Sequence, residues 1–286
     1  MNTPVLHHPV SVKSAKFLLG GIVSLGLLSA PSQAALTAYR NAVIADGAIA
    51  YYEFEETVGT TISDSAGGDN NGTIVGGVGL NQTGGPIGLG RSSSYNGTDA
   101  RVRIPDNAIF DLGTGAFSVE VWYRANVTTR GDLITYKGSG GDFGIHSGSQ
   151  SANTTSLYHN TYRIQNAPVN PAGGAWNHLV AVRTGGNISM YVNGVLSQTV
   201  ADGDSMNITN DLLIGTNHMG SPDNPTLLFN GLIDEVAIYP SALSAAQVAN
   251  HFALASAPEP GAAGLLALAG VAGLRRRRKV ISEEAR

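Results

Sequence analysis

Short segments in which apolar and polar residues alternate recur between residues 48 and 239, and they predict β-strands. The clearest is Phe117–Tyr123, in which apolar residues occupy every second position. Successive side chains of a strand point to opposite faces, so this segment has one apolar face and carries Trp122 on the other face with Ser118 and Glu120. Apolar contacts on both faces are typical of a central strand in a β-sandwich.

Further alternating segments are bounded by Gly, Asn, Asp and Pro, which favour turns. Asn193-Gly194 separates Ile188–Val192 from Val195–Val200, and this pair strongly predicts a two-residue β-hairpin. The other predicted strands are Ala48–Phe54, Arg91–Asn96, Arg101–Ile104, Asp132–Tyr136, Asp142–His146, Ser156–Tyr158, Tyr162–Ile164, Ala175–Arg183, Asp211–Gly215 and Phe229–Tyr239. We therefore expect an all-β fold of two antiparallel sheets, followed by a short helix that Ser244 caps.

The last predicted strand, Phe229–Tyr239, carries two adjacent carboxylates among apolar residues. Regular alternation places Asp234 on the face of Leu232 and Val236, and Glu235 on the opposite face. A carboxylate between apolar neighbours must reach water, accept hydrogen bonds or bind a cation. The sequence leaves open an edge position, at which the charge is solvated.

Composition narrows the class of protein further. The 286 residues carry a net charge of -4, only 13% are charged, and Gly is abundant at 37. Basic residues cluster only near the C-terminus, so we expect no nucleic-acid partner. The chain has no Cys, which excludes disulfides and a thiol nucleophile, and stability must come from the core or from a metal.

The N-terminus has the three parts of a secretory signal peptide. Lys13 and Lys16 precede the apolar run 17–28, and Ser32-Gln33-Ala34 provides small residues for cleavage. We expect a signal peptide over residues 1–34, with cleavage after Ala34 and export of the rest. The apolar run is short for a transmembrane helix.

The C-terminus combines Pro258-Glu259-Pro260, an apolar run over 261–274 and the basic run Arg275-Arg276-Arg277-Arg278. As a helix the apolar run rises about 21 Å, short of a hydrocarbon core of about 30 Å. This order resembles the PEP-CTERM sorting signal of Gram-negative bacteria. The resemblance implies transient anchoring of residues 257–286 in the inner membrane, an exosortase as partner, and retention at the cell surface or in the extracellular matrix.

The segment Gly231–Tyr239, followed by Ser241–Val248, resembles the last strand and following helix of concanavalin A-like, laminin-G-like jellyroll domains. Tyr95-Asn96-Gly97 and Ala175–Arg183 resemble two further segments of that family. The resemblance covers roughly residues 45 to 253. It implies a two-sheet jellyroll domain over residues 35–256.

Domains of this family often hold a calcium ion, and the resemblance implies where its ligands lie in this chain. The matching carboxylate is Asp234, with carbonyl oxygens from near Glu53 and from Gly97. Calcium takes six to eight oxygen ligands, so further carbonyls and water complete the shell. The Asx-rich loop 62–74 lacks the spacing of an EF-hand and is interpreted as a Gly/Asx turn.

We find no motif of a zinc hydrolase, of a nucleophile elbow or of a phosphate-binding loop in the sequence. Glycanases of the same fold use two carboxylates on one strand, whereas the comparable segment here carries only Glu120. We therefore expect no enzymatic activity. Candidate sugar-binding residues are Tyr136, Tyr158, His159 and Tyr162, although each also suits a core or turn position.

The hypothesis that follows is an exported, non-catalytic module that binds carbohydrate, such as an exopolysaccharide or envelope glycan. The carbohydrate part rests on the family resemblance, because fold does not determine function. There are two alternatives. One is a structural surface protein that contacts other proteins, and the weaker one is a glycan hydrolase or lyase.

Overall fold

The computed structural model describes residues 30–86, 90–137, 142–148, 151–207, 209–221 and 224–256. The predicted sorting segment 257–286 lies outside the described residues. The predicted signal peptide also lies outside them, except for the backbone of residues 30–34. Among the described residues, no helix is both long and apolar enough to cross a membrane.

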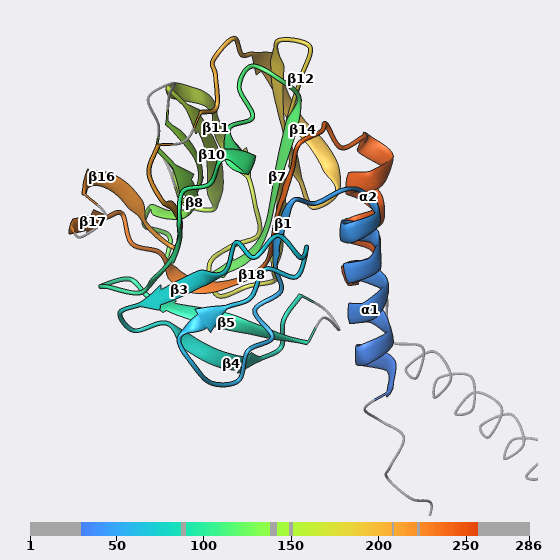
Figure 1. Cartoon of the computed structure of the whole chain (residues 1–286), viewed down its shortest axis with the longest axis vertical. Coiled ribbons are helices and arrows are strands. Elements are labelled where there is room, and N and C mark those ends of the chain that lie inside the picture. Colours follow the sequence, from blue (N-terminus) through green and yellow to red (C-terminus); the bar gives the residue numbers. More distant parts are fainter. Residues whose placement is uncertain are drawn as a thin grey trace, which may run out of the picture.

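Two antiparallel sheets form the body of the protein (Figure 1). In the first sheet β18 is central, with β7 along one side and both β5 and β1 along the other. The strands of this sheet are, in order, β14 (Val195–Ala201), β13 (Asn187–Val192), β12 (Asn177–Thr184), β7 (Phe117–Ala125), β18 (Asn230–Tyr239), β5 (Arg91–Asn96) and β4 (Gly79–Thr83), with β1 (Ala50–Tyr52) on β18.

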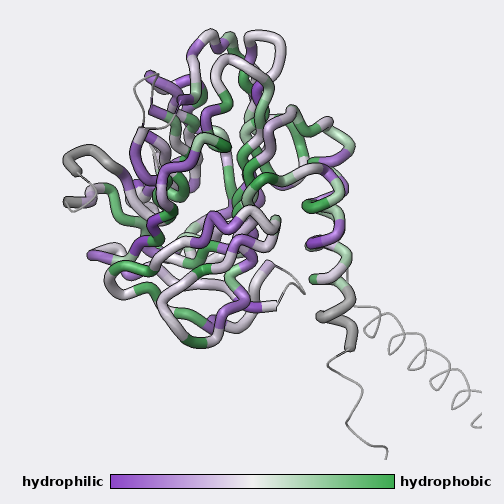
Figure 2. Tube along the Cα trace, in the orientation of Figure 1, coloured by the Kyte–Doolittle hydropathy of each residue, from purple (hydrophilic) through white to green (hydrophobic). Residues whose placement is uncertain are grey.

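The second sheet packs face to face on the first and encloses the main core. Val119 and Ile233 from the first sheet meet Ile134 and Ile145 from the second in one apolar cluster. Figure 2 shows hydrophobic and hydrophilic residues interspersed along the strands. The strands of the second sheet are, in order, β11 (Thr161–Pro168), β10 (Thr154–His159), β9 (Phe143–Ser147), β8 (Gly131–Tyr136), β15 (Leu212–Ile214), β6 (Arg101–Ile104), β3 (Gly72–Val75) and β2 (Thr61–Ile62).

Three small elements complete the fold around this sandwich. A 3-10 helix, η1 (Ala108–Phe110), places Phe110 in the core. The strands β16 (Asn217–Ser221) and β17 (Asn224–Thr226) form a two-stranded sheet of their own. The predicted two-sheet antiparallel sandwich is therefore confirmed.

Two helices, α1 (Ala30–Ala45) and α2 (Ala245–Ser256), lie side by side against the outer face of the first sheet (Figure 1). Tyr39 of α1 and Val248 of α2 are buried there with Trp122 and Tyr239 of the sheet. This second apolar cluster explains why Trp122 points away from the main core, as the alternation of β7 predicts.

The predicted N-cap of α2 is confirmed as a reciprocal capping box. The N–H of Gln247 donates to Ser244 Oγ at 3.2 Å, and the N–H of Ser244 donates to Gln247 Oε1 at 2.8 Å. The Asn193-Gly194 hairpin is also confirmed. Its residues have φ of 50° and 79°, as a two-residue turn between twisted strands requires.

A β-bulge interrupts β18 and changes the faces that its residues occupy. From Asp234 to Ala237 the strand β18 advances three residues, while its partner β7 advances only two, from Trp122 to Glu120. Glu235, within this bulge, has φ 51°. The predicted alternation is therefore wrong at this point. Ile233, instead of Leu232, shares the main core with Val236. The edge alternative is also wrong, because both carboxylates are fully buried in a central strand.

The Asx-rich loop after β2 is a hydrogen-bonded turn, as expected. The Asp64 carboxylate accepts the backbone N–H groups of Tyr51, Ala66 and Asn70, and also the side-chain amide of Asn70. These four donors satisfy the charge without a cation.

Candidate functional site

A cavity of about 210 Å³ opens on the outer face of the second sheet, over β8 to β11. Two cross-strand rows lie on this face. Asp132, His146 and Ser156 are paired across β8, β9 and β10, and the next outward row brings Gly144 beside Tyr158. Paired residues of antiparallel strands share a face, so the two rows lie beneath the cavity, and His146 and Tyr158 line it.

The aromatic part of the cavity consists of Tyr158, Tyr162 and His146. The two tyrosine rings meet edge to face, with centroids 5.3 Å apart and planes at 83°. His146 stands at 80° to Tyr162, with centroids 6.0 Å apart. Both tyrosines are half-buried. Their exposed ring surfaces can stack against the C–H faces of a sugar.

The polar part of the cavity is organised by Asp132, which is fully buried. Arg130 donates from Nε to Asp132 Oδ1 at 3.0 Å and from Nη2 to Oδ2 at 3.3 Å. Asn217 donates from Nδ2 to Asp132 Oδ2 at 2.5 Å. Arg130 Nη1 donates to the Tyr162 hydroxyl, and its guanidinium lies 5.6 Å from the centroid of that ring. The buried Asp132 carboxylate therefore fixes the guanidinium of Arg130, which in turn holds the ring of Tyr162.

His146 is neutral at pH 7, because burial, and to a smaller extent Arg130, lowers its pKa to about 4 despite the nearby Asp132 carboxylate. Arg130 is only a donor, so the contact of 3.4 Å from its Nη2 makes His146 Nε2 an acceptor. The ring proton is then on Nδ1, which donates to Ser156 Oγ at 3.3 Å.

The row Asp132–His146–Ser156 contains the residue types of a hydrolytic triad, but its geometry does not suit nucleophilic catalysis. Ser156 is fully buried and does not line the cavity. The lone pair of His146 accepts from Arg130 and is directed away from Ser156. We interpret the row as a hydrogen-bonded floor.

Gly144 leaves space in that floor. A Cβ at this position lies 2.7 Å from His146 Nε2 and 3.2 Å from the Thr135 methyl group. These contacts are too short to tolerate without moving His146. Any larger residue at position 144 therefore displaces the imidazole and narrows the cavity.

The structure brings three of the four predicted sugar-binding residues together. Tyr136, Tyr158 and Tyr162 line the cavity, although the ring of Tyr136 also belongs to the main core. His159 does not line it. It is fully buried, and its Nδ1 lies 2.9 Å from Asp202 Oδ2.

The sequence interpretation missed the polar half of the cavity, Arg130, Asp132, His146 and Asn217. One signal was present in the sequence. Asp132 and His146 are ionisable residues within predicted strands, where apolar residues are the rule. Their pairing depends on the register of β8 with β9, which the sequence does not reveal.

The side chains of His159, Asp202 and Asp204 lie close enough together to share a metal ion. Two arginines already neutralise this group, since Asp202 accepts from Arg183 Nε at 2.9 Å and pairs with Arg163 Nε at 3.3 Å. We interpret it as an internal ion-pair cluster that ties β10 and β12 to the loop after β14.

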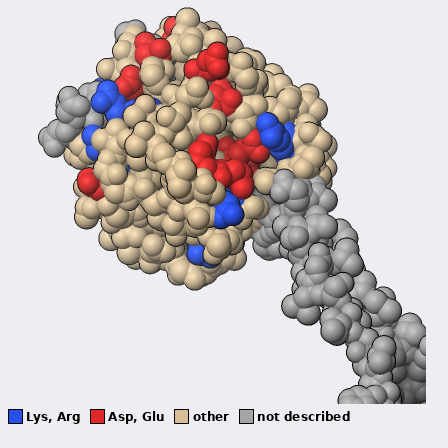
Figure 3. Space-filling model, turned by 60° about the horizontal axis from the view of Figure 1, so that its bottom comes forward, with Lys and Arg blue, Asp and Glu red and all other residues tan. Residues whose placement is uncertain are grey.

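A second candidate centre is an acidic cluster around the β18 bulge. Burial, reinforced by Glu235, Glu55 and Glu53, raises the pKa of Asp234 well above its usual value. Burial also raises the pKa of Glu235, helped by Glu53, Glu55 and Glu120 and opposed by the hydrogen bond from Tyr51. Among the described residues, Asp234 Oδ2 and Glu235 Oε1 are buried without a hydrogen-bond partner. Figure 3 shows acidic side chains gathered beside isolated basic ones on the surface of the molecule, whereas Asp234 and Glu235 themselves are fully buried.

The predicted calcium ligands are only partly brought together. Glu53 is close enough to Asp234 to raise its pKa. Gly97 follows Asn96, which pairs with Asn230, four positions before Asp234 and roughly 13 Å away along the strand. The Gly97 carbonyl therefore lies beside Asn230, whereas Glu55 and Glu235 are the groups near Asp234.

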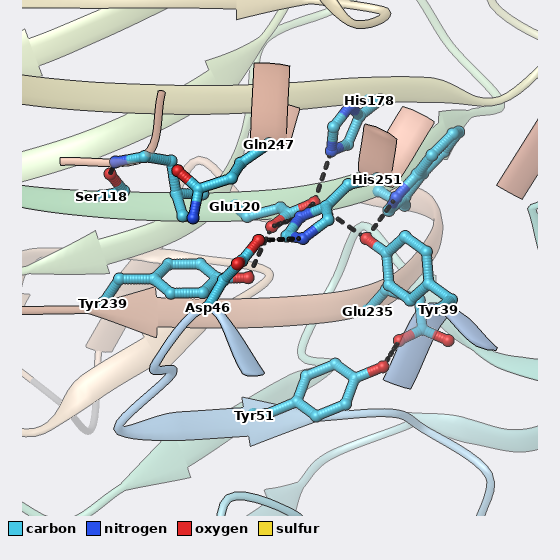
Figure 4. A network of polar contacts seen from close by, with 12 residues as sticks. Tyr39, Asp46, Tyr51, Ser118, Glu120, His178, Glu235, Tyr239, Gln247 and His251 are labelled. Carbon is cyan, nitrogen blue, oxygen red and sulfur yellow. Dashed lines mark hydrogen bonds and ion pairs between the residues drawn. The ribbon is translucent and has the colours of Figure 1, made fainter. Parts of the chain in front are cut away.

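A third polar group is the buried network around Glu120, between the first sheet and the two helices (Figure 4). Glu120 accepts from the hydroxyls of Tyr39 and Tyr239, both at 2.8 Å, and from His178 Nε2 at 2.6 Å. His251 Nδ1 donates to Glu120 Oε2 at 3.0 Å. Glu120 is the only acid in the segment comparable with the catalytic strand of glycanases, and it is thus enclosed and fully hydrogen-bonded.

A family model described as the Concanavalin A-like lectin/glucanases superfamily, of laminin G type, matches residues 96–249, more than half of the chain. The chain belongs to this superfamily. The matched region contains β7, β12, β18 and every cavity residue named above. No curated protein matches the sequence.

Solved structures give the same fold. One is Domain 4 of AbnA, a GH43 extracellular arabinanase from Geobacillus stearothermophilus, in complex with arabinotriose. It is 22% identical with a TM-score of 0.57, over 72% of this chain and 98% of that chain.

Two toxin structures are also similar. One is a structure of botulinum neurotoxin type C, whose cell entry depends on interaction with two ganglioside molecules. It is 16% identical with a TM-score of 0.56, over 74% of this chain and 52% of that chain. The binding domain of Paraclostridial Mosquitocidal Protein 1 is 13% identical with a TM-score of 0.58, over 73% of this chain and 52% of that chain. This chain thus spans about half of each toxin chain. At these identities the likeness concerns the fold.

Proposed function

We propose that this protein is a non-catalytic carbohydrate-binding module, and that sugar binds in the cavity over β8 to β11. The observation that carries the proposal is the combination of two half-buried tyrosine rings with a fixed polar floor. Sugar sites need ring faces for C–H groups and a few positioned polar groups for hydroxyls. The structural similarity to an arabinanase domain in complex with arabinotriose and to a ganglioside-dependent toxin supports this ligand class.

The proposal includes export and retention at the cell surface or in the extracellular matrix. It rests on the signal-peptide pattern through Ala34 and on the Pro258-Glu259-Pro260 segment with its arginine run. In this proposal an exosortase acts on the C-terminal segment while its apolar run is inserted in the inner membrane. Mass spectrometry of the secreted protein tests both ends, because it gives the N-terminal and C-terminal residues directly.

A glycan array tests the binding function. The purified protein is compared with Tyr162→Ala, which removes one of the two half-buried tyrosine rings of the cavity, and with Tyr191→Ala, which removes a half-buried tyrosine of β13 outside the cavity. We expect Tyr162→Ala to weaken the signal at least about tenfold, as the loss of a stacking anchor does, and Tyr191→Ala to retain it. Equal loss in both variants, or no signal from any glycan, contradicts the proposal.

We also propose that a calcium ion stabilises the acidic cluster, with Asp234 and Glu53 as ligands. Asp234 Oδ2 and the neighbouring Glu235 Oε1, both buried without a partner among the described residues, support a cation there. A metal that binds only the folded state raises the melting temperature. We expect calcium to raise it relative to a chelator, and Asp234→Asn to remove that difference. Identical melting with calcium and with chelator contradicts the calcium site and leaves the carbohydrate proposal intact.

A further inference from the structure

The two kinds of glycan named for similar structures differ in charge. Arabinotriose is uncharged, whereas gangliosides carry acidic sialic acid. An acidic sugar is best held by an arginine that offers two parallel N–H groups to its carboxylate. The hydrogen bonds that Arg130 already makes at this cavity therefore help to decide whether an uncharged or an acidic glycan fits.

Arg130 has little donor capacity left for a ligand. A guanidinium has five N–H groups. Within the described part of the chain, Nε and Nη2 together donate twice to Asp132, Nη2 also donates to His146 Nε2, and Nη1 donates to Tyr162. Four of the five N–H groups are thus in use. A ligand carboxylate can form two parallel hydrogen bonds with Arg130 only if Arg130 gives up its contacts with Asp132, whose carboxylate is fully buried.

The charges of the described residues at the cavity also balance. Arg130 faces Asp132, and Lys137 and Asp142 add one charge of each sign to the lining. His146 contributes no charge, because its Nε2 accepts from Arg130. A cavity without net charge gives no electrostatic gain to an acidic ligand. The tyrosine faces favour the C–H groups that neutral sugars present.

We propose that the cavity selects uncharged sugars over acidic sugars such as sialic acids and uronic acids. This inference rests on the proposed carbohydrate-binding function and adds the chemical class of the ligand. Asp132 acts here as a specificity-determining residue, because it occupies the arginine that an acidic sugar requires.

Matched pairs of glycans test the selection. The purified protein is applied to an array that contains arabinotriose, lactose and sialyllactose, together with neutral oligosaccharides and their uronic-acid counterparts, at low and at high salt. We expect binding only to neutral members, with signals that salt does not change, because no ion pair forms with the ligand. Preferential binding of sialylated or uronate members, lost at high salt, overturns the selection but keeps the carbohydrate function. Absence of binding to every glycan overturns the function itself, and the selection with it.

A charge variant gives a second test. Asp132→Asn keeps the shape of the side chain and removes the counter-charge of Arg130, so we expect sialyllactose binding to rise about tenfold, the effect of one charge-assisted hydrogen bond. Asp211→Asn is the matched control. It removes the carboxylate that accepts from Arg103 on the same sheet, outside the cavity. An equal gain in both variants overturns the role of Asp132. The selectivity of the unmodified protein decides the proposal if Asp132→Asn does not fold, which its circular dichroism shows.

Discussion

Replacement of Glu120 by alanine is the most severe single perturbation that the structure suggests. The carboxylate is fully buried between the first sheet and the helices α1 and α2. Burial raises its pKa, but His251 and His178 outweigh that effect and hold the pKa well below its usual value. Glu120 is therefore ionised in the folded protein.

The cost of Glu120→Ala can be worked out from its partners. Burial, and then the Glu120 charge, raise the pKa of Tyr39 and Tyr239 well above the usual value, so both hydroxyls stay protonated and donate. The variant leaves these two donors and those of His178 and His251 without their acceptor. Each unsatisfied buried donor costs about 1–3 kcal/mol, and removal of one member of a buried ion pair costs about 3–5 kcal/mol. We expect a loss of about 5 kcal/mol, which is comparable with the whole stability of a small domain.

Urea unfolding followed by circular dichroism measures this loss. Tyr39→Phe is the graded control, because it removes one hydrogen bond to Glu120 and the acceptor of Trp122 Nε1. We expect it to cost about 1–2 kcal/mol. A loss below about 1 kcal/mol in Glu120→Ala would contradict this expectation, since buried donors that lose their charged acceptor should lower the free energy of unfolding by more than that.

Three further predictions follow from other contacts. Burial lowers the pKa of His251, but Glu120 and Asp46 outweigh burial and raise the pKa above its usual value. The stability that His251 contributes is therefore complete below about pH 6.5 and is lost as the pH rises through its folded pKa. His251→Gln should flatten that part of a plot of unfolding free energy against pH. In Gly144→Val the added carbons displace His146, and we expect glycan binding to fall at least about tenfold on the array while circular dichroism stays native. Ser244→Ala removes the capping box of α2, and urea unfolding should show a loss of about 1 kcal/mol, whereas a loss near zero would show that tertiary packing alone holds the helix.

Much of the fold could be predicted because its strands obey local rules. The alternation in β7 fixes both of its faces. Asn193-Gly194 fixes the first pairs of a hairpin, Val192 with Val195 and Tyr191 with Leu196, without reference to the rest of the chain. The β18 bulge could not be predicted in this way. Its extra residue, Glu235, is defined by pairing with β7, more than 100 positions earlier in the sequence.

The helix α1 was not predicted, because its N-terminal part coincides with the expected cleavage site after Ala34. Its role becomes apparent only in three dimensions, where Tyr39 reaches Glu120 and Trp122. The same limit applies to the cavity. Tyr158 and Tyr162 could be suggested as single aromatic residues, whereas the polar floor depends on strand register and on Asn217, which follows the distant strand β15.

In the proposed function, sugar occupies the cavity over β8 to β11. Amide chemical-shift mapping by nuclear magnetic resonance tests it most directly, with a neutral glycan that gives a signal on the array. We expect the largest shifts at Gly144, His146, Tyr158 and Tyr162, and no response from β13 and β14 of the other sheet. Shifts confined to another surface, with Gly144 unchanged at saturation, would contradict it.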